Sequence, residues 1–212
     1  VAPVVGCGRW PAKAVVGETV EVSATVFREG HEMLGAAVVL RTPEGEELPG
    51  QRMAEVGEGL DRWAAEVTPT RTGSWSFRVE AWGDPIAHWW HDAQIKVPRG
   101  QDAELMLTEG VALFRRAARG ASPEDRRTLA RLVRVVSDED VDVLERLAAA
   151  GDPDVWDVLE RHPLRDLLTL GDWHPLTYTW HRSNYVHLDP HTQPAHILTF
   201  QRNEGRARAD GN

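Results

Sequence analysis

The chain has 212 residues, of which 42% are hydrophobic and 27% charged, and its formal net charge is -9. This length allows one large domain or two small ones, and the apolar share is ordinary for a globular protein. Because acidic and basic residues are interspersed, there is no basic field to attract a nucleic acid and no polybasic segment for a membrane surface. We therefore expect neither nucleic acid nor a membrane as a partner.

Cysteine usage and the first residue bear on the location of the protein. The single cysteine, Cys7, cannot form an internal disulfide, and no stretch is typical of a signal peptide or of a long apolar span. These features predict a cytoplasmic location. The chain begins at Val1 rather than Met, which indicates a trimmed terminus or a fragment.

Alternating apolar residues predict strands in the first part of the chain. Residues 18–27 and 73–82 have this pattern, residues 36–41 are a short apolar run, and residues 60–67 are a further candidate strand. Along residues 73–82, Trp75, Phe77 and Val79 share one face, while Arg78 and Glu80 lie on the other. Turn residues rich in Gly and Pro separate the segments. Short strands at this spacing predict an immunoglobulin-like β-sandwich over residues 1–100.

The fourth strand is followed at once by a second aromatic segment. Gly83-Asp84-Pro85 ends the strand, and we expect the next residues to complete a hairpin-like unit. In a strand, Trp89 and Trp90 would point to opposite faces, so the tryptophans cannot all form one sugar platform. Packing in a core or an interface is the favoured interpretation. The alternative is contact with a glucan through Trp82, Trp89 and Trp90, because the C–H faces of sugars stack on indole rings.

A helical period replaces the strand pattern and predicts a small helical bundle over residues 101–170. Ser122, which a proline follows, is typical of a helix start. Ser137 is predicted to cap the next helix, and Asp152 to begin a third. Residues 164–170 are expected to form a turn or a short helix. The sequence thus predicts an α+β protein with a sandwich followed by helices.

Residues 171–212 form an irregular tail rich in histidine and aromatic residues. Imidazoles at close spacing, with Asp189 as a carboxylate ligand, can bind zinc. The histidines concerned are His174, His181, His187, His191 and His196. Because Pro190 and Pro194 break any helical geometry and no recognised ligand spacing is complete, we predict no metal site.

Three further groups were candidates for chemistry. Asp84 and Asp92 flank the tryptophan pair, but Asp84 is explained more simply as a turn residue. Cys7 has no base near it in the sequence, which argues against a nucleophile. Arg9 and Lys13 suit a structural salt bridge better than a phosphate site. We therefore predict no catalytic residue and no cofactor.

Three strings of residues, at 3–17, 22–31 and 75–85, occur in an order typical of one family. Together they resemble the amino-terminal region of the actinobacterial α-1,4-glucan:maltose-1-phosphate maltosyltransferases, and the likeness continues to Thr169. The resemblance implies a β-sandwich and an inserted helical bundle, which together build a homodimer around a catalytic (β/α)8 barrel of the α-amylase clan.

The segment that follows the helical region is too short to form this barrel. The barrel needs on the order of 250 residues, whereas only residues 171–212 follow the helical region. The resemblance therefore implies a non-catalytic dimerisation and accessory region of an enzyme that moves maltosyl units from α-maltose 1-phosphate to an α-1,4-glucan. A catalytic barrel supplied elsewhere is then a candidate partner.

The tail and the function leave alternatives open. Residues 178–183 resemble the segment that leads into the family barrel, which makes Ser183 a candidate substrate-binding residue. The other interpretation likens residues 185–202 to the carboxy-terminal β-domain of the family. The whole chain could also be a stand-alone glucan-binding module, a truncated fragment without activity, or an enzyme that acts through its tail.

Overall fold

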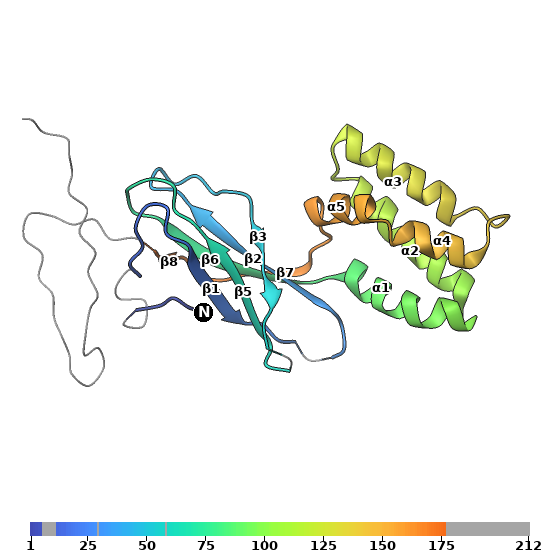
Figure 1. Ribbon diagram of the computed structural model, residues 1–212, viewed down its shortest axis with the longest axis horizontal. Coiled ribbons are helices and arrows are strands. Elements are labelled where there is room, and N and C mark those ends of the chain that lie inside the picture. Colours follow the sequence, from blue (N-terminus) through green and yellow to red (C-terminus); the bar gives the residue numbers. More distant parts are fainter. Residues whose placement is uncertain (6–11, 29, 58, 177–212) are drawn as a thin grey trace, which may run out of the picture. The chain divides into compact units, whose positions relative to one another are not determined.

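A computed structural model describes residues 1–5, 12–28, 30–57 and 59–176, whose course is shown in Figure 1. These residues form two sheets and five α-helices. The sheets include no closed barrel among the described residues, and the α+β class predicted from the sequence is confirmed. No helix in the described part is both long enough and apolar enough to cross a membrane.

Eight short strands make up the two sheets. They are β1 (Val20–Thr25), β2 (Leu34–Arg41), β3 (Gln51–Arg52), β4 (Ala54–Glu55), β5 (Arg62–Val67), β6 (Ser76–Gly83), β7 (Asp166–Leu170) and β8 (His174–Pro175). One sheet has the order β1-β5-β4, and the other has the order β3-β2-β6-β7, with β8 also paired to β6. Strands β1, β2, β5 and β6 overlap the four segments in which the sequence predicts strands.

Side chains from both sheets share one apolar core. Val22 of β1, Val38 of β2 and Phe77 of β6 are almost completely buried in it. Burial of such side chains is the main favourable term in folding. Trp75 also lies in this core, and its indole nitrogen donates to the backbone carbonyl oxygen of Arg71 at 2.9 Å. Two sheets across one core are consistent with the predicted sandwich.

Five helices occupy the chain between β6 and β7. They are α1 (Pro85–Lys96), α2 (Ala103–Ala118), α3 (Pro123–Val136), α4 (Val143–Ala150) and α5 (Pro153–Arg161). Ser122 and Asp152 are N-caps, as predicted. The prediction for Ser137 was wrong, because this residue ends α3. The cap of α4 is Asp142, whose side chain accepts a hydrogen bond from the Leu144 N–H at 2.9 Å.

Helix α1 corrects the hairpin expected after Gly83. The Asp84 carboxylate caps the helix by accepting a hydrogen bond from the Ala87 N–H at 3.0 Å, and Pro85 takes the first helical position. Trp89 and Trp90 are therefore neighbours on a helix, about 100° apart around its axis, and not on opposite faces of a strand. The boundaries at residues 100 and 170 stay predictions.

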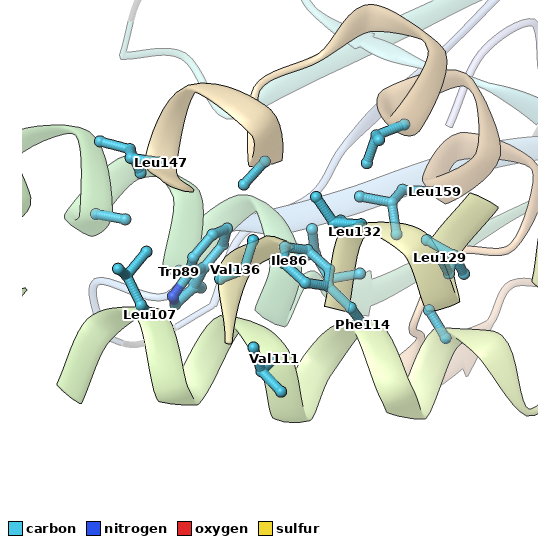
Figure 2. Packing of buried hydrophobic residues seen from close by; sticks show 14 of the residues in the cluster. Ile86, Trp89, Leu107, Val111, Phe114, Leu129, Leu132, Val136, Leu147 and Leu159 are labelled. Atoms are coloured by element: carbon cyan, nitrogen blue, oxygen red, sulfur yellow. The ribbon is translucent and has the colours of Figure 1, made fainter. Parts of the chain in front are cut away.

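Trp89 lies within the helical core, as Figure 2 shows. Its indole nitrogen donates to the backbone carbonyl oxygen of Met106 at 2.6 Å, and its ring meets that of Phe114 edge-on with centroids 5.2 Å apart. Such edge-to-face pairs are favoured by the charge distribution of aromatic rings. At Gly110 of α2, a Cβ atom would lie 2.3 Å from the Trp89 ring. The close approach of α1 and α2 therefore depends on glycine at this position.

Strand β7 corrects the turn or helix expected at residues 164–170. It pairs antiparallel with β6, so that Gly83 lies opposite Asp166 and Glu80 lies opposite Leu170. The helices are thus inserted between two neighbouring strands of one sheet. The return is also held by Arg116 of α2, which forms an ion pair with Asp166.

Gly110→Ala should lower the free energy of unfolding by about 1–3 kcal/mol, because the added methyl group overpacks the site against a hydrogen-bonded indole. The higher helix propensity of alanine, about 1 kcal/mol, offsets only part of this loss. Urea denaturation followed by circular dichroism measures the change. Gly120→Ala is the matched control, because no atom lies within 4 Å of the place that its added methyl group would take. Equal midpoints for the two variants would contradict the close contact.

Candidate functional site

One face of the five-stranded sheet carries a cluster of tryptophan, arginine and acidic residues on the side away from the shared core. This second-face cluster consists of Arg41, Glu47, Arg52, Arg78, Glu80, Trp82, Asp84, Arg165 and Trp173. Side chains alternate along β6, which places Arg78, Glu80 and Trp82 opposite Phe77. Arg52 and Glu80 both pair with Ala37, so the register brings them to the same face.

The carboxylate of Glu80 is at the centre of this cluster, and its side chain is only 5% exposed. Its Oε1 accepts hydrogen bonds from Nε and Nη2 of Arg78 at 3.0 and 2.7 Å, and its Oε2 accepts one from Nη1 of Arg165 at 2.8 Å. A buried charge is tolerated when such charge-assisted bonds satisfy it. Glu80 therefore fastens the segment before β7 to the middle of the sheet.

The two tryptophans of the cluster are covered by guanidinium groups. The Cζ of Arg165 lies 4.6 Å from the Trp82 ring centroid, and the Cζ of Arg52 lies 5.6 Å from it. Over Trp173, the corresponding distances are 3.7 Å for Arg41 and 4.7 Å for Arg78. Cation–π contacts of this kind are attractive because the ring face is electron-rich. The ring faces are thus already engaged by groups of the same chain.

A pocket of about 420 Å³ lies beside the N-terminus of α1. It is lined by Arg28, Glu32, Gly83, Asp84, Pro85, His88, Asp166 and Leu167. Each of its carboxylates has an arginine partner: Glu32 pairs with Arg28, Asp84 with Arg52 at 2.6 Å, and Asp166 with Arg116. The three carboxylates are thus engaged by guanidinium groups, whereas the buried Nδ1 of His88 has no hydrogen-bond partner among the described residues.

The structure separates the tryptophans that the sequence brings together. Trp82 lies in the second-face cluster and is 2% exposed, whereas Trp89 lies in the helical core and is 4% exposed. Trp90 is partly buried, with its ring 5.7 Å from that of Trp156. Ser183 lies outside the described residues. Neither Trp82 nor Trp89 offers a free ring face to a sugar in this structure.

Asp84 and Asp92 do not form a catalytic pair. They are eight residues apart along α1, which corresponds to about 12 Å along the helix axis. Carboxyl pairs in glycosidases are roughly 5 to 9.5 Å apart. A hydrogen bond from Lys96 to Asp92, with Nζ and Oδ2 2.5 Å apart, lowers the pKa of that carboxyl. Asp92 is therefore an ionised partner of Lys96 on the surface of a helix.

The residues considered for metal and thiol chemistry mostly lie outside the described part of the chain. Outside it lie Cys7, Arg9, Asp189 and the histidines considered for zinc other than His174. The His174 ring packs 5.4 Å from that of Phe77. Within the residues that the structure describes, no group of three or more His, Cys, Asp or Glu side chains could hold a metal ion.

Sequence reasoning missed the second-face cluster. The sequence pattern places Glu80 on the polar face of its strand, where an acidic residue is expected and indicates no special role. Its partner Arg165 is 85 positions away in the chain. A signal was present in Trp82, whose place on the same face as Arg78 and Glu80 follows from the alternation of β6. A large apolar ring beside charged residues on that face indicates that other parts of the protein pack over the face.

Fold and site together define a class of protein, an α+β module in which helices are inserted between two paired strands. The charged residues of its cluster connect different segments of the same chain. Comparison with known families is specific. The family model described as alpha-1,4-glucan:maltose-1-phosphate maltosyltransferase, domain N/S, matches residues 1–178. The chain belongs to this family, and the resemblance noted in the sequence is confirmed.

Individual relatives have the same description. Alpha-1,4-glucan:maltose-1-phosphate maltosyltransferases 1 and 2 of Streptomyces coelicolor are 53% and 54% identical to the chain, over 87% of this chain and 28% of each relative. The enzyme of that name from Mycobacterium tuberculosis is 42% identical, over 57% of this chain and 21% of the relative. The chain therefore spans less than a third of the length of these curated relatives.

Glu80→Gln should lower the free energy of unfolding by about 1.5–3 kcal/mol, because it weakens charge-assisted hydrogen bonds to two arginines in a buried place. Urea denaturation at neutral pH measures the loss. Glu47→Gln is the matched control: its carboxylate bonds to the same Arg78 at 3.0 Å but is 41% exposed, and exposed pairs contribute about 0–1 kcal/mol. If both variants lose the same stability, burial of Glu80 is not what makes its bonds important.

Proposed function

We propose that the chain is the non-catalytic, amino-terminal accessory region of an α-1,4-glucan:maltose-1-phosphate maltosyltransferase. The observation that carries this proposal is the family match over residues 1–178, which includes every residue that the structure describes. Glycosyl transfer requires two carboxyl groups that face a cleft. The buried carboxylates of Glu80 and Asp84 are instead bonded to arginines, which supports a structural role.

The activity of the complete protein is part of the proposal. By resemblance, a (β/α)8 barrel transfers maltosyl units from α-maltose 1-phosphate to an α-1,4-glucan during cytoplasmic glucan synthesis. The names of the relatives support this substrate pair. The accessory region would help to form a homodimer through its sheets and helices. The greater length of the relatives supports a catalytic part beyond the matched region.

The 212-residue chain, incubated with α-maltose 1-phosphate and glycogen, should release no phosphate. Full-length Streptomyces coelicolor maltosyltransferase 1 is the positive control in the same phosphate assay. Light scattering of the chain should give the mass of a dimer. Turnover by the chain alone would overturn the non-catalytic role, and a monomeric mass at all concentrations would overturn the proposed dimerisation.

Glucan binding through Trp82, Trp89 and Trp90 is the alternative function, and the burial of Trp82 and Trp89 gives it no support. Isothermal titration with maltoheptaose up to millimolar concentration should therefore give no saturable heat. Trp90 is only partly buried, whereas the other two rings are buried, so Trp90→Ala is the informative variant. Trp63→Ala, at a half-buried position on β5, is its control. Heat that disappears in the Trp90 variant alone would establish a glucan-binding module.

A further inference from the structure

Strand β7 contains one residue more than the stretch of β6 that it faces. Asp166 pairs with Gly83 and Thr169 pairs with Ala81, so three steps along β7 match two along β6. Leu167 lies in this bulge with a φ of 54°. The left-handed conformation costs roughly 1–2 kcal/mol for a residue with a Cβ atom. A bulge of this kind redirects a side chain, and here that side chain is a leucine.

The register shift against β6 explains the left-handed backbone at this position, but it does not explain why the residue is a leucine. The other described non-glycine residues with positive φ are Asp61 and Asp102, and aspartate tolerates this conformation. Leu167 is 73% exposed, so its strain is not offset by packing within the described chain. Strained residues persist where surrounding structure determines them. Packing within the described residues therefore does not explain a leucine at this position.

The neighbours of Leu167 are also exposed and apolar. Leu168 and Leu170 are 43% and 54% exposed, and β7 is the last strand in the order of its sheet. Proteins normally protect such edges with charged residues, proline or a covering segment, because an open edge pairs with other chains. β7 has Asp166 at its start, but its next two residues are leucines. An uncovered apolar edge of this kind marks a contact surface.

The size of the surface indicates what covers it. Three leucines offer at most on the order of 300 Å² of apolar surface, whereas separate chains in a stable complex bury about 800 Å² per partner. A covalently linked module needs a smaller contact, because its effective concentration is already in the millimolar range. The matched family region ends at residue 178, and the Streptomyces relatives extend far beyond the 28% that the chain covers.

We propose that β7 is a docking edge for the module that follows the N/S region in the longer maltosyltransferases. Leu167, Leu168 and Leu170 are buried against an apolar surface of that module, and the contact stabilises the bulge. Leu167 also lines the pocket beside α1, so the docking surface continues into that pocket. This inference rests on the proposed function, because it requires a downstream module.

Hydrogen exchange of the β7 amides tests the docking. The 212-residue chain is compared with a chimaera in which residues 1–178 replace the matching region of Streptomyces coelicolor maltosyltransferase 1. Amides of residues 167–170 should exchange at least about tenfold more slowly in the chimaera, independently of protein concentration. Equal exchange in both proteins overturns the proposal. Protection that appears in the 212-residue chain as its concentration rises assigns the edge to a second copy, and also overturns it.

Leu167→Gly separates docking from folding. Glycine adopts a φ of 54° without strain, so the melting temperature of the 212-residue chain should stay the same or rise. In the chimaera, the same substitution should return the exchange of residues 168–170 toward the rate in the chain. Leu105→Ala removes a leucine that is 57% exposed on α2, and it should leave exchange in β7 unchanged. Equal effects of the two substitutions on β7 exchange would overturn the proposal.

If the chimaera does not fold, the intact Streptomyces enzyme provides the measurement. Slow exchange in its segment aligned with residues 166–170 supports docking, and exchange at the rate of an open edge overturns it. The outcome is distinguishable from failure of the proposed function. Phosphate release by the 212-residue chain contradicts the non-catalytic role whatever the exchange result, whereas fast exchange of β7 in an active chimaera contradicts only the docking.

Discussion

The pairing of β7 with β6 is the constraint on which the rest of the structure depends. It requires that a chain leaving the sheet at Gly83 returns beside it at Asp166 after five helices. Closing so long a loop costs conformational entropy, although this cost rises only slowly with length. The helices offset it by burying a core of their own, and Arg165 offsets it at the point of return by binding Glu80. The helical region is thus an insertion in a sheet.

The tryptophans of the two cores, which lie in the described part of the chain, are used for packing. A segment rich in indole rings invites comparison with sugar-binding surfaces, because ring faces bind the C–H groups of sugars. Here the described rings are engaged within the chain, although the buried indole nitrogen of Trp82 has no hydrogen-bond partner among the described residues. Trp89 donates to a backbone carbonyl of α2, Trp75 donates to one before β6, and Trp82 lies beneath two guanidinium groups. Tryptophan in small domains gains much from burial when its N–H finds an acceptor.

Local patterns predicted the elements whose structure is decided locally. Alternation located β6, and the caps Ser122 and Asp152 located the starts of α3 and α5. Helix α1 was missed because Asp followed by Pro is common both in turns and at helix starts, and the turn was chosen. The apolar spacing of Ile86, Trp89 and Ala93 would have favoured the helix.

The elements that sequence reasoning could not locate depend on distant partners. β7 has no alternation of its own, and it is a strand because β6 supplies its hydrogen bonds. The cluster around Glu80 depends on an arginine 85 residues later in the chain. The bulge at Leu167 likewise exists only in relation to the register of another strand. Such features depend on how the strands assemble into a sheet, and patterns among neighbouring residues do not predict that assembly.

The meeting of Gly83 and Asp166 across the sheet has an evolutionary consequence. Because the two ends of the helical insertion lie side by side, helices can be gained, shortened or exchanged there without displacing the strands on either side. Sheet and insertion can therefore diverge at different rates, each under selection for its own surface. An insertion point of this kind allows the helices to change in one lineage while the sheet stays the same.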